Sequence, residues 1–245
     1  MIGATILAAE ACLRVGVGSV KIICNRKTLP ILANRFPSVL KIEINNYTFL
    51  RKFLKKEGKT THVALVGPGA GKSFKTMRFT EEILKNIKYV ILDADSLNSF
   101  ENKTGKLLKY LDKNKLITPH QAEFHRLFPT IKKKINNKEK VLKFLKLSKS
   151  NILLKGNLTV IGSSKKIIIN NHTSSELAVI GSGDVLVGIL ASLVGDKKMT
   201  LSEAAAAATW IHGDIAKYTG KGLISEDLIK GIPLALSRLK KWARY

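Results

Sequence analysis

The chain is poor in cysteine, in aromatic residues and in acidic residues, and each shortage excludes a class of protein. Only Cys12 and Cys24 occur among 245 residues, and both have apolar neighbours. Two such thiols predict buried, reduced cysteines in a cytoplasmic protein. No apolar run reaches the roughly 20 residues that a membrane-spanning helix needs. The chain also begins without a basic stretch and apolar core, which argues against a secretory signal.

Acidic residues are so few that the formal net charge is +24, from 42 basic and 18 acidic residues. A charge of this size is typical of many nucleic-acid-binding proteins. However, only eight of the basic residues are arginine, the residue that contacts bases and phosphates in a bidentate manner. The lysines are spread along the chain, and the densest run, Lys132 to Lys134, has no interleaved aromatic residues. We therefore expect no specific nucleic-acid partner, and a positive field that attracts an anionic nucleotide.

Hydrophobic residues make up 45% of the chain, enough for a sizeable core. Strand patterns are expected at 19–24, 39–44, 62–66, 89–92, 116–117, 151–154, 158–161 and 166–170, and helical patterns at 5–15, 47–56, 72–86, 185–193, 202–218 and 226–242. Their alternation predicts one α/β domain over residues 1–245, with a mainly parallel sheet covered on both faces. Polar and glycine-rich segments follow the strands, where open α/β sheets bind ligands.

The segment from Gly181 to Gly188 joins glycines, a serine and a carboxylate to an apolar helix. The glycines allow the backbone to approach a ligand closely. A helix that begins at about Gly183 directs free N–H groups and the positive end of its dipole toward that ligand, which suits a phosphate or a developing anion. The alternative is structural: Asp184 is then a first-turn residue that stabilises the helix, and the glycines form a tight turn.

Two further motifs follow expected strands. The loop from Gly67 to Gly71 precedes a helix and predicts either a ligand-binding loop or a structural turn, and its spacing is not that of a Walker loop. Asp93 and Asp95 place two carboxylates at the next strand end, where they can orient a ligand hydroxyl or a metal-bound water. The alternative for Asp95 is that it caps a helix.

Two basic motifs come later in the chain. His120 lies at an expected helix start, where it can donate a hydrogen bond to a ligand, and Glu123 lies on the same helical face. A helix cap is the alternative for this pair. Lys155 and the backbone amides that follow it, as far as Thr159, can meet nucleotide phosphates. A hairpin turn between two short strands is the alternative there.

In this order the motifs resemble the ADP/ATP-dependent NAD(P)H-hydrate dehydratase family, which has a ribokinase-like fold. The resemblance covers nearly the whole chain. The matching segments are Gly3-Ala4 with the alanine-rich helix after them, residues 67–71, residues 93–98, Thr118-Pro119-His120 with Glu123, residues 154–156 with Thr159, residues 181–186, and His212-Gly213. The resemblance implies a three-layer αβα fold.

The resemblance also implies a lyase that repairs a damaged cofactor in the cytoplasm. Members of the family use ADP or ATP, with Mg²⁺, to phosphorylate the hydroxyl of the S form of hydrated NADH or NADPH. Phosphate then leaves and the reduced cofactor is restored. The implied partners are the hydrate, an adenine nucleotide and further copies of the chain in a homotetramer, with no membrane. Three alternatives stay open: another small-molecule kinase of this fold, a basic nucleic-acid-binding protein, and a scaffold with reduced activity.

By the same resemblance, each motif has a role. Asp184 is the catalytic base, and the hydrate contacts Ala4, Gly69, Gly71, His120 and Asp184. The anion hole consists of the backbone amides of Gly181, Ser182 and Gly183. The nucleotide-binding residues are Lys155, Gly156, Asn157, Leu158, Thr159 and Gly183. Glu123 positions Mg²⁺ through water.

The chain departs from the family pattern at several positions. Ser174-Ser175-Glu176 stands where the family has Asn-Pro-Gly, Ile180 stands where it has glycine, and Gln121-Ala122 stands where it has Pro-Gly. The segment after His212-Gly213 is shorter, and the strand and glycine-rich loop that precede the position of Gly3 in the family are not in this sequence. We expect a form extended upstream to be more stable or more active, since an α/β sheet without an expected strand exposes an unpaired edge.

Overall fold

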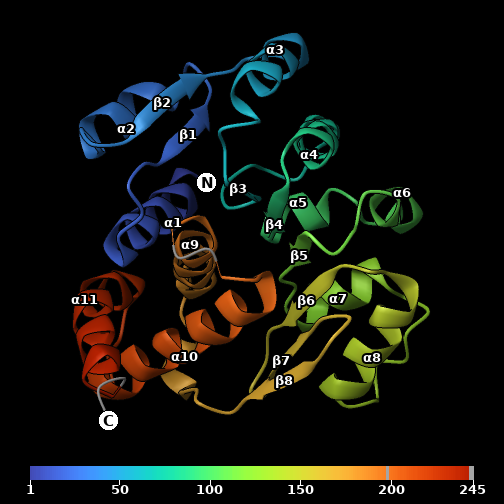
Figure 1. Cartoon of the computed structure of the whole chain (residues 1–245), viewed down its shortest axis with the longest axis vertical. Coiled ribbons are helices and arrows are strands. Elements are labelled where there is room, and N and C mark those ends of the chain that lie inside the picture. Colours follow the sequence, from blue (N-terminus) through green and yellow to red (C-terminus); the bar gives the residue numbers. More distant parts are fainter. Residues whose placement is uncertain (197–198, 243–245) are drawn as a thin grey trace.

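The computed structural model describes residues 1–196 and 199–242, in which helices cover both faces of a six-stranded sheet (Figure 1). The strands are β3 (Val63–Val66), β4 (Tyr89–Leu92), β5 (Lys115–Ile117), β6 (Asn151–Leu154), β7 (Thr159–Gly162) and β8 (Ile167–Asn170), and they lie side by side in that order. The pairs from β3 to β6 are parallel, whereas β7 and β8 pair in the antiparallel sense. The predicted mainly parallel αβα fold is confirmed.

Two buried cores form because alternate residues of a strand point to opposite faces of the sheet. On one face, Ile91 of β4 and Leu116 of β5 pack with helices α1 (Ile2–Val15), α9 (Ser182–Gly195), α10 (Leu201–Thr219) and α11 (Ser225–Trp242). On the other face, Val90, Leu92 and Ile117 pack with α3 (Tyr47–Glu57), α4 (Phe74–Asn86), α5 (Ala94–Asn98), α6 (Thr104–Leu108), α7 (Gln121–Leu127) and α8 (Asn137–Leu147). The sheet is thereby buried between two layers of helices.

The N-terminal part of the chain forms a second, smaller sheet. It pairs β1 (Lys21–Cys24) with β2 (Leu40–Glu43) in parallel and carries α2 (Leu29–Arg35) over a small core of its own. The sequence patterns predicted these strands without distinguishing a second sheet. Within the described ranges β1 pairs only with β2, and β3 pairs only with β4, so each of these strands has one edge without a neighbouring strand.

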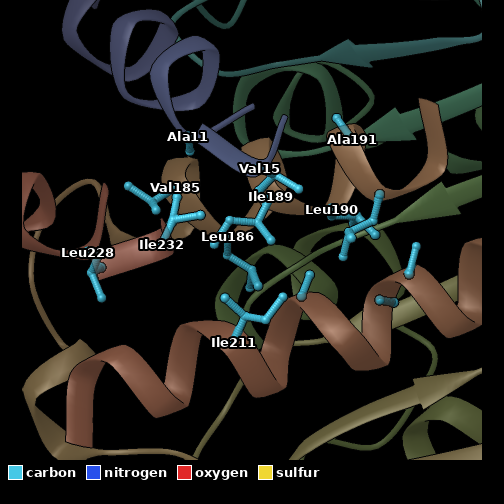
Figure 2. Packing of buried hydrophobic residues seen from close by; sticks show 14 of the residues in the cluster. Ala11, Val15, Val185, Leu186, Ile189, Leu190, Ala191, Ile211, Leu228 and Ile232 are labelled. Atoms are coloured by element: carbon cyan, nitrogen blue, oxygen red, sulfur yellow. The ribbon is translucent and has the colours of Figure 1, made fainter. Parts of the chain in front are cut away.

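Helix α9 is the central helix of the first core. Figure 2 shows Leu186 and Ile189 of α9 among the buried side chains between α1 and α10. Gly188 lies where α9 crosses α1, and a Cβ at this position would overlap the carbonyl oxygen of Ala8. This close approach brings the N-terminal turns of α1 and α9 to the same end of the sheet.

The two thiols are free, Cys24 buried and Cys12 half-buried. Burial raises the pKa of the Cys12 thiol to about 11, which keeps it protonated and unreactive at neutral pH. Among the helices that the structure describes, none has the length and apolar character needed to cross a bilayer.

Candidate active site

The carboxyl ends of the parallel strands bring four of the predicted motifs together. At the end of β4, Asp93 is 2% exposed, and its Oδ1 accepts hydrogen bonds from Thr118 Oγ1 and Lys155 Nζ, both at 2.7 Å. Gly67, at the end of β3, has a φ of 130°, and a Cβ there would overlap the carbonyl oxygen of Asp93. Since these residues follow four neighbouring strands, the sheet itself determines their proximity.

Asp93 and Asp95 have different partners, although they are two residues apart. Asp93 binds Lys155 and Thr118, whereas Asp95 Oδ2 accepts a hydrogen bond of 2.7 Å from the backbone N–H of Gly71. Asp95 therefore fixes the loop 67–71. No group of three or more His, Cys, Asp or Glu side chains in residues 1–196 and 199–242 is arranged to hold a metal ion by itself.

Lys155 is the cation of the site. Burial disfavours its charge, but the neighbouring carboxylates of Asp93, Glu123 and Asp184 outweigh burial, and the net effect raises the pKa of the ammonium group. Lys155 is thus protonated at neutral pH. Its Nζ lies 3.6 Å from the point where Gly183 would carry a Cβ, so the ammonium group faces the first turn of α9.

That first turn is the predicted anion site. Gly181, the N-cap, has a φ of 91°, a conformation that favours glycine. The backbone N–H groups of Gly181 and Gly183 have no hydrogen-bond acceptor within the described part of the chain. The N–H of Ser182 contacts the carbonyl oxygen of Val179 at 3.3 Å, and its hydroxyl donates to Leu177 O at 2.7 Å. Of the three predicted donors, the two glycines are therefore the ones that are free to bind an anion.

Asp184 follows directly in the first turn of α9. Burial, and next the negative charge of Asp93, raise the pKa of its carboxyl group to about 6, and Lys155 opposes this rise. A carboxylate with a pKa near neutrality can accept a proton and later release it. The pKa of Asp184 thus suits general base catalysis, which a purely helix-stabilising first-turn carboxylate would not require.

The residues predicted to face the substrate lie around this point. The amino group of Met1 donates to Gly69 O at 3.3 Å, and Thr5 Oγ1 donates to Pro68 O at 3.0 Å, so the turn of α1 that carries Ala4 lies against the loop with Gly69 and Gly71. The side chain of His120 is 50% exposed. Its Nδ1 accepts a hydrogen bond from the N–H of Ala122 at 3.1 Å, which leaves the proton on Nε2 available to a ligand.

Glu123 and the loop 155–159 also show the structural roles that were left open. Glu123 Oε2 accepts a hydrogen bond from the N–H of His120 at 3.0 Å and forms a capping box for α7. Its Oε1 has two long contacts, 3.5 Å to Asn98 Nδ2 and 3.6 Å to His120 Nε2, and keeps the capacity to bind a water. Residues 155–159, which include Gly156, Asn157 and Leu158, form the turn between the antiparallel strands β6 and β7, and Thr159 Oγ1 donates to Gly156 O at 3.2 Å.

His212 of α10 is a residue of this site to which the sequence alone assigned no role. It is 6% exposed, and burial lowers the pKa of its imidazole to about 4 although it hydrogen-bonds the backbone of Ser182. The neutral imidazole ring thus holds the first turn of α9 in place through its hydrogen bond to the backbone of Ser182. The available signal was the His212-Gly213 segment of the family resemblance, together with its place on a largely apolar helical stretch, where a buried histidine indicates a specific polar partner.

Comparisons with known proteins agree with this geometry. A family model described as NAD(P)H-hydrate dehydratase matches residues 1–230. The ADP-dependent (S)-NAD(P)H-hydrate dehydratase of Neisseria meningitidis is 32% identical over an alignment that covers 98% of this chain and 83% of that protein. Other relatives are bifunctional NAD(P)H-hydrate repair enzymes, and the chain spans about half of their length, 48% for the Dictyoglomus turgidum protein.

Solved structures show the same fold. A ribokinase-like superfamily protein from Enterococcus faecalis superposes with a TM-score of 0.83 at 24% identity, covering 96% of this chain and 82% of that one. The ADP/ATP-dependent NAD(P)H-hydrate dehydratase of Bacillus subtilis, co-crystallised with ATP and Mg²⁺, has a TM-score of 0.78 at 22% identity, covering 97% of this chain and 87% of that one.

Proposed function

Because the chain belongs to the NAD(P)H-hydrate dehydratase family, we propose that it uses ADP or ATP to dehydrate the S form of hydrated NADH or NADPH. The observation that carries the proposal is the position of Asp184. Asp184, with a carboxyl pKa of about 6, directly follows the free backbone N–H of Gly183, and the ammonium group of Lys155 faces the same helix turn. The first turn of α9 thus carries a base and an anion site, and a cation from the end of β6 faces it. Phosphoryl transfer to a hydroxyl requires these three groups.

The first step of the proposed reaction transfers a phosphoryl group to the substrate. Asp184 accepts the proton of the hydroxyl on the nicotinamide ring as that oxygen attacks the terminal phosphorus of the nucleotide. The N–H groups of Gly181 and Gly183 stabilise the charge on the transferred phosphoryl oxygens. Lys155, with Gly156, Asn157, Leu158 and Thr159, holds the remaining phosphates.

The second step removes the phosphate. The ring carbon–oxygen bond breaks, phosphate leaves with the bonding electrons, and a proton leaves the neighbouring ring carbon, which restores the reduced nicotinamide. Ala4, Gly69, Gly71 and His120 hold the ring during both steps, and His120 offers its Nε2 proton to the substrate.

Glu123 fits a role in holding Mg²⁺ through water, since its Oε1 has no short hydrogen bond and the described residues supply no full set of metal ligands. Mg²⁺ usually keeps several waters and binds nucleotide phosphates. When bound there, it would neutralise phosphate charge during transfer.

The test is to offer the purified protein hydrated NADH or NADPH with ADP or with ATP and to follow the return of the reduced-nicotinamide absorbance. We expect turnover of the S epimer only. The Asp184→Asn variant should lose activity by roughly 10²–10⁴-fold, because a positioned base is removed while the shape is kept. Equal rates for wild type and variant would refute the role of Asp184.

We also propose a homo-oligomer, a tetramer by resemblance to the family, in the cytoplasm. Support comes from large apolar side chains that are half or more exposed near the small sheet, namely Ile31, Leu40 and Phe49. Free thiols support the compartment. Light scattering coupled to gel filtration measures the mass, and a monomer at micromolar concentration would contradict the assembly.

A further inference from the structure

A surface depression of about 490 Å³ lies next to the proposed site and has no role in the reaction described above. Its lining residues are Gln121, Ala122, His125, Arg126 and Lys133. Its lining residue Gln121 directly follows His120 in the sequence, and Gln121 Nε2 donates a hydrogen bond of 3.2 Å to the carbonyl oxygen of Lys155. The depression therefore borders both the substrate-facing histidine and the loop 155–159.

The charge around the depression is positive and uncompensated. Lys140, only 6% exposed, donates from Nζ to Gln121 Oε1 at 2.8 Å. Within the part of the chain that the structure describes, neither Lys140, Arg126 nor Lys133 forms an ion pair with a carboxylate. Glu101 acts on Arg126 only at longer range and is itself paired with Lys72. A buried ammonium group without a counter-ion is costly, so an anion bound here would stabilise the arrangement.

His125 adds a polar group to the same place. Its Nδ1 is buried and has no hydrogen-bond partner. Burial, and then the charges of Lys140 and Lys133, lower the pKa of the imidazole, so the ring is neutral at physiological pH. A buried nitrogen usually has a hydrogen-bond partner, and a ligand or an ordered water can supply one here.

The guanidinium group of Arg126 is held in place by the residues of the active site. Arg126 Nη2 donates to Asn98 Oδ1 at 2.9 Å, Asn98 Nδ2 contacts Glu123 Oε1 at 3.5 Å, and Glu123 Oε2 accepts from the N–H of His120 at 3.0 Å. The remaining guanidinium N–H groups have no acceptor among the described residues. A pre-oriented arginine with free donors is suited to a phosphate.

We propose that this depression binds the 2′-phosphate of hydrated NADPH and distinguishes it from hydrated NADH. The inference rests on the proposed function, since it assigns a subsite to that substrate. A phosphomonoester is a dianion and matches the two cations that line the depression, Arg126 and Lys133, better than a diester phosphate does. Arg126 lies six positions after His120, about 9 Å along the helix, so a phosphate bound at Arg126 occupies a subsite distinct from that of the ring at His120.

Binding of 2′-phospho-ADP-ribose and of ADP-ribose, measured by calorimetry, tests the subsite without any turnover. We expect the wild type to bind the 2′-phosphorylated probe about tenfold more tightly, a preference that weakens as salt rises. Arg126→Gln and Lys133→Gln should each lose most of this preference. Lys132→Gln removes the same charge from the neighbouring position, which does not line the depression, and should keep it. All three side chains are exposed, so the variants should fold, and thermal midpoints verify this.

Two results of the binding experiment would overturn the proposal: equal binding of both probes by the wild type, or an equal loss in Lys132→Gln. In steady-state assays, Arg126→Gln should raise KM for hydrated NADPH about tenfold and leave KM for hydrated NADH and for ADP unchanged. An equal rise for both hydrates would also overturn it. If the wild type converts neither hydrate, the proposed function fails, and the binding comparison still decides whether the subsite exists.

Discussion

Asp93 is the residue on which the polar side chains of the site depend. It is buried at a strand end, it pairs with Lys155, and it accepts a hydrogen bond from the hydroxyl of Thr118. Its negative charge contributes to the raised pKa of Asp184, and Lys155 acts in the opposite direction. A structural ion pair and a reactive carboxylate are thus coupled, so the protonation of Asp184 reports on the whole cluster.

At the scale of the single residue, we predict that Asp184 lowers the stability of the fold while it provides activity. Its folded pKa of about 6 lies above the ordinary 3.8, so ionisation costs the folded state stability between these two values and the cost stays constant at higher pH. Asp184→Asn should therefore raise the thermal midpoint by about 2–4 °C near pH 8, equivalent to about 1 kcal/mol once solvent screening of the half-buried group is allowed for. Thermal melts should show this difference shrinking toward about pH 4.

The matched control is Glu226→Gln, which makes the same carboxylate-to-amide change at an exposed position. It should not share the pH-dependent gain. A wild type as stable as Asp184→Asn near pH 8 would show that the Asp184 carboxylate ionises without cost.

The same pKa predicts a pH profile for the reaction. The base must be ionised, so kcat/KM for the hydrate should fall about tenfold per pH unit below pH 6 and level off above it. Rates measured across this range with saturating ADP, alongside thermal melts that establish folding at each pH, check the prediction. A profile that stays flat to about pH 5 would exclude Asp184 as the base that controls the rate.

At the scale of elements, the position of the anion site depends on the contact between α1 and α9. The N-terminal turn of α1 reaches the loop 67–71 through Met1 and Thr5, and α9 supplies Gly181 and Gly183. Both helices pack on the same face of the sheet, and Gly188 allows their backbones to approach. The groups proposed to face the substrate and the phosphate are therefore positioned relative to one another by the crossing of α1 and α9.

We accordingly predict that Gly188→Ala is destabilising. Its Cβ would overlap the carbonyl oxygen of Ala8, so α1 must move away from α9, at a cost of about 1–3 kcal/mol. The control is Gly105→Ala in α6, where no atom lies within 4 Å of the added Cβ and helix propensity favours alanine by about 0.5–1 kcal/mol. Denaturant unfolding should give opposite signs for the two changes, and kcat/KM should fall only for Gly188→Ala. A stable, fully active Gly188→Ala would contradict this account of the crossing.

At the scale of the whole molecule, the net charge of +24 produces a positive electrostatic field around the protein. Lysine supplies most of it, and the structure adds Arg126 and Lys133 to the lining of the depression beside α7, which contains no Phe, Tyr or Trp. Such a field attracts polyanions and nucleotides alike, and it does not read a base sequence.

We expect duplex DNA to bind weakly, without sequence preference and with a steep loss of affinity as salt rises, because counter-ion release is the main source of that affinity. Fluorescence anisotropy with two unrelated duplexes, from about 50 to about 200 mM salt, measures both properties. Tight, sequence-selective binding at the higher salt would instead indicate a nucleic-acid function.

The sequence by itself determined the alternation of strands and helices and the motifs at the strand ends, because these depend on local periodicity and on glycine and capping preferences. The family resemblance placed Asp184, His120 and Lys155 in one site, and neighbouring parallel strands, which end at one edge of a sheet, explain why His120 and Lys155 lie together. Helices α2, α5 and α6 were not predicted, because five to seven residues carry too few turns to show a helical period. Helix α8 was missed because lysines dominate its exposed face.

Only the tertiary structure decided which groups in these motifs are free to act. It separated the roles of Asp93 and Asp95, showed that the Ser182 N–H is engaged while those of Gly181 and Gly183 are free, and raised the pKa of Asp184. It also divided the strands between two sheets and brought Lys140 beside Gln121. Each of these outcomes depends on burial and on contacts between distant segments, and these arise from packing and cannot be inferred from the local pattern of residues.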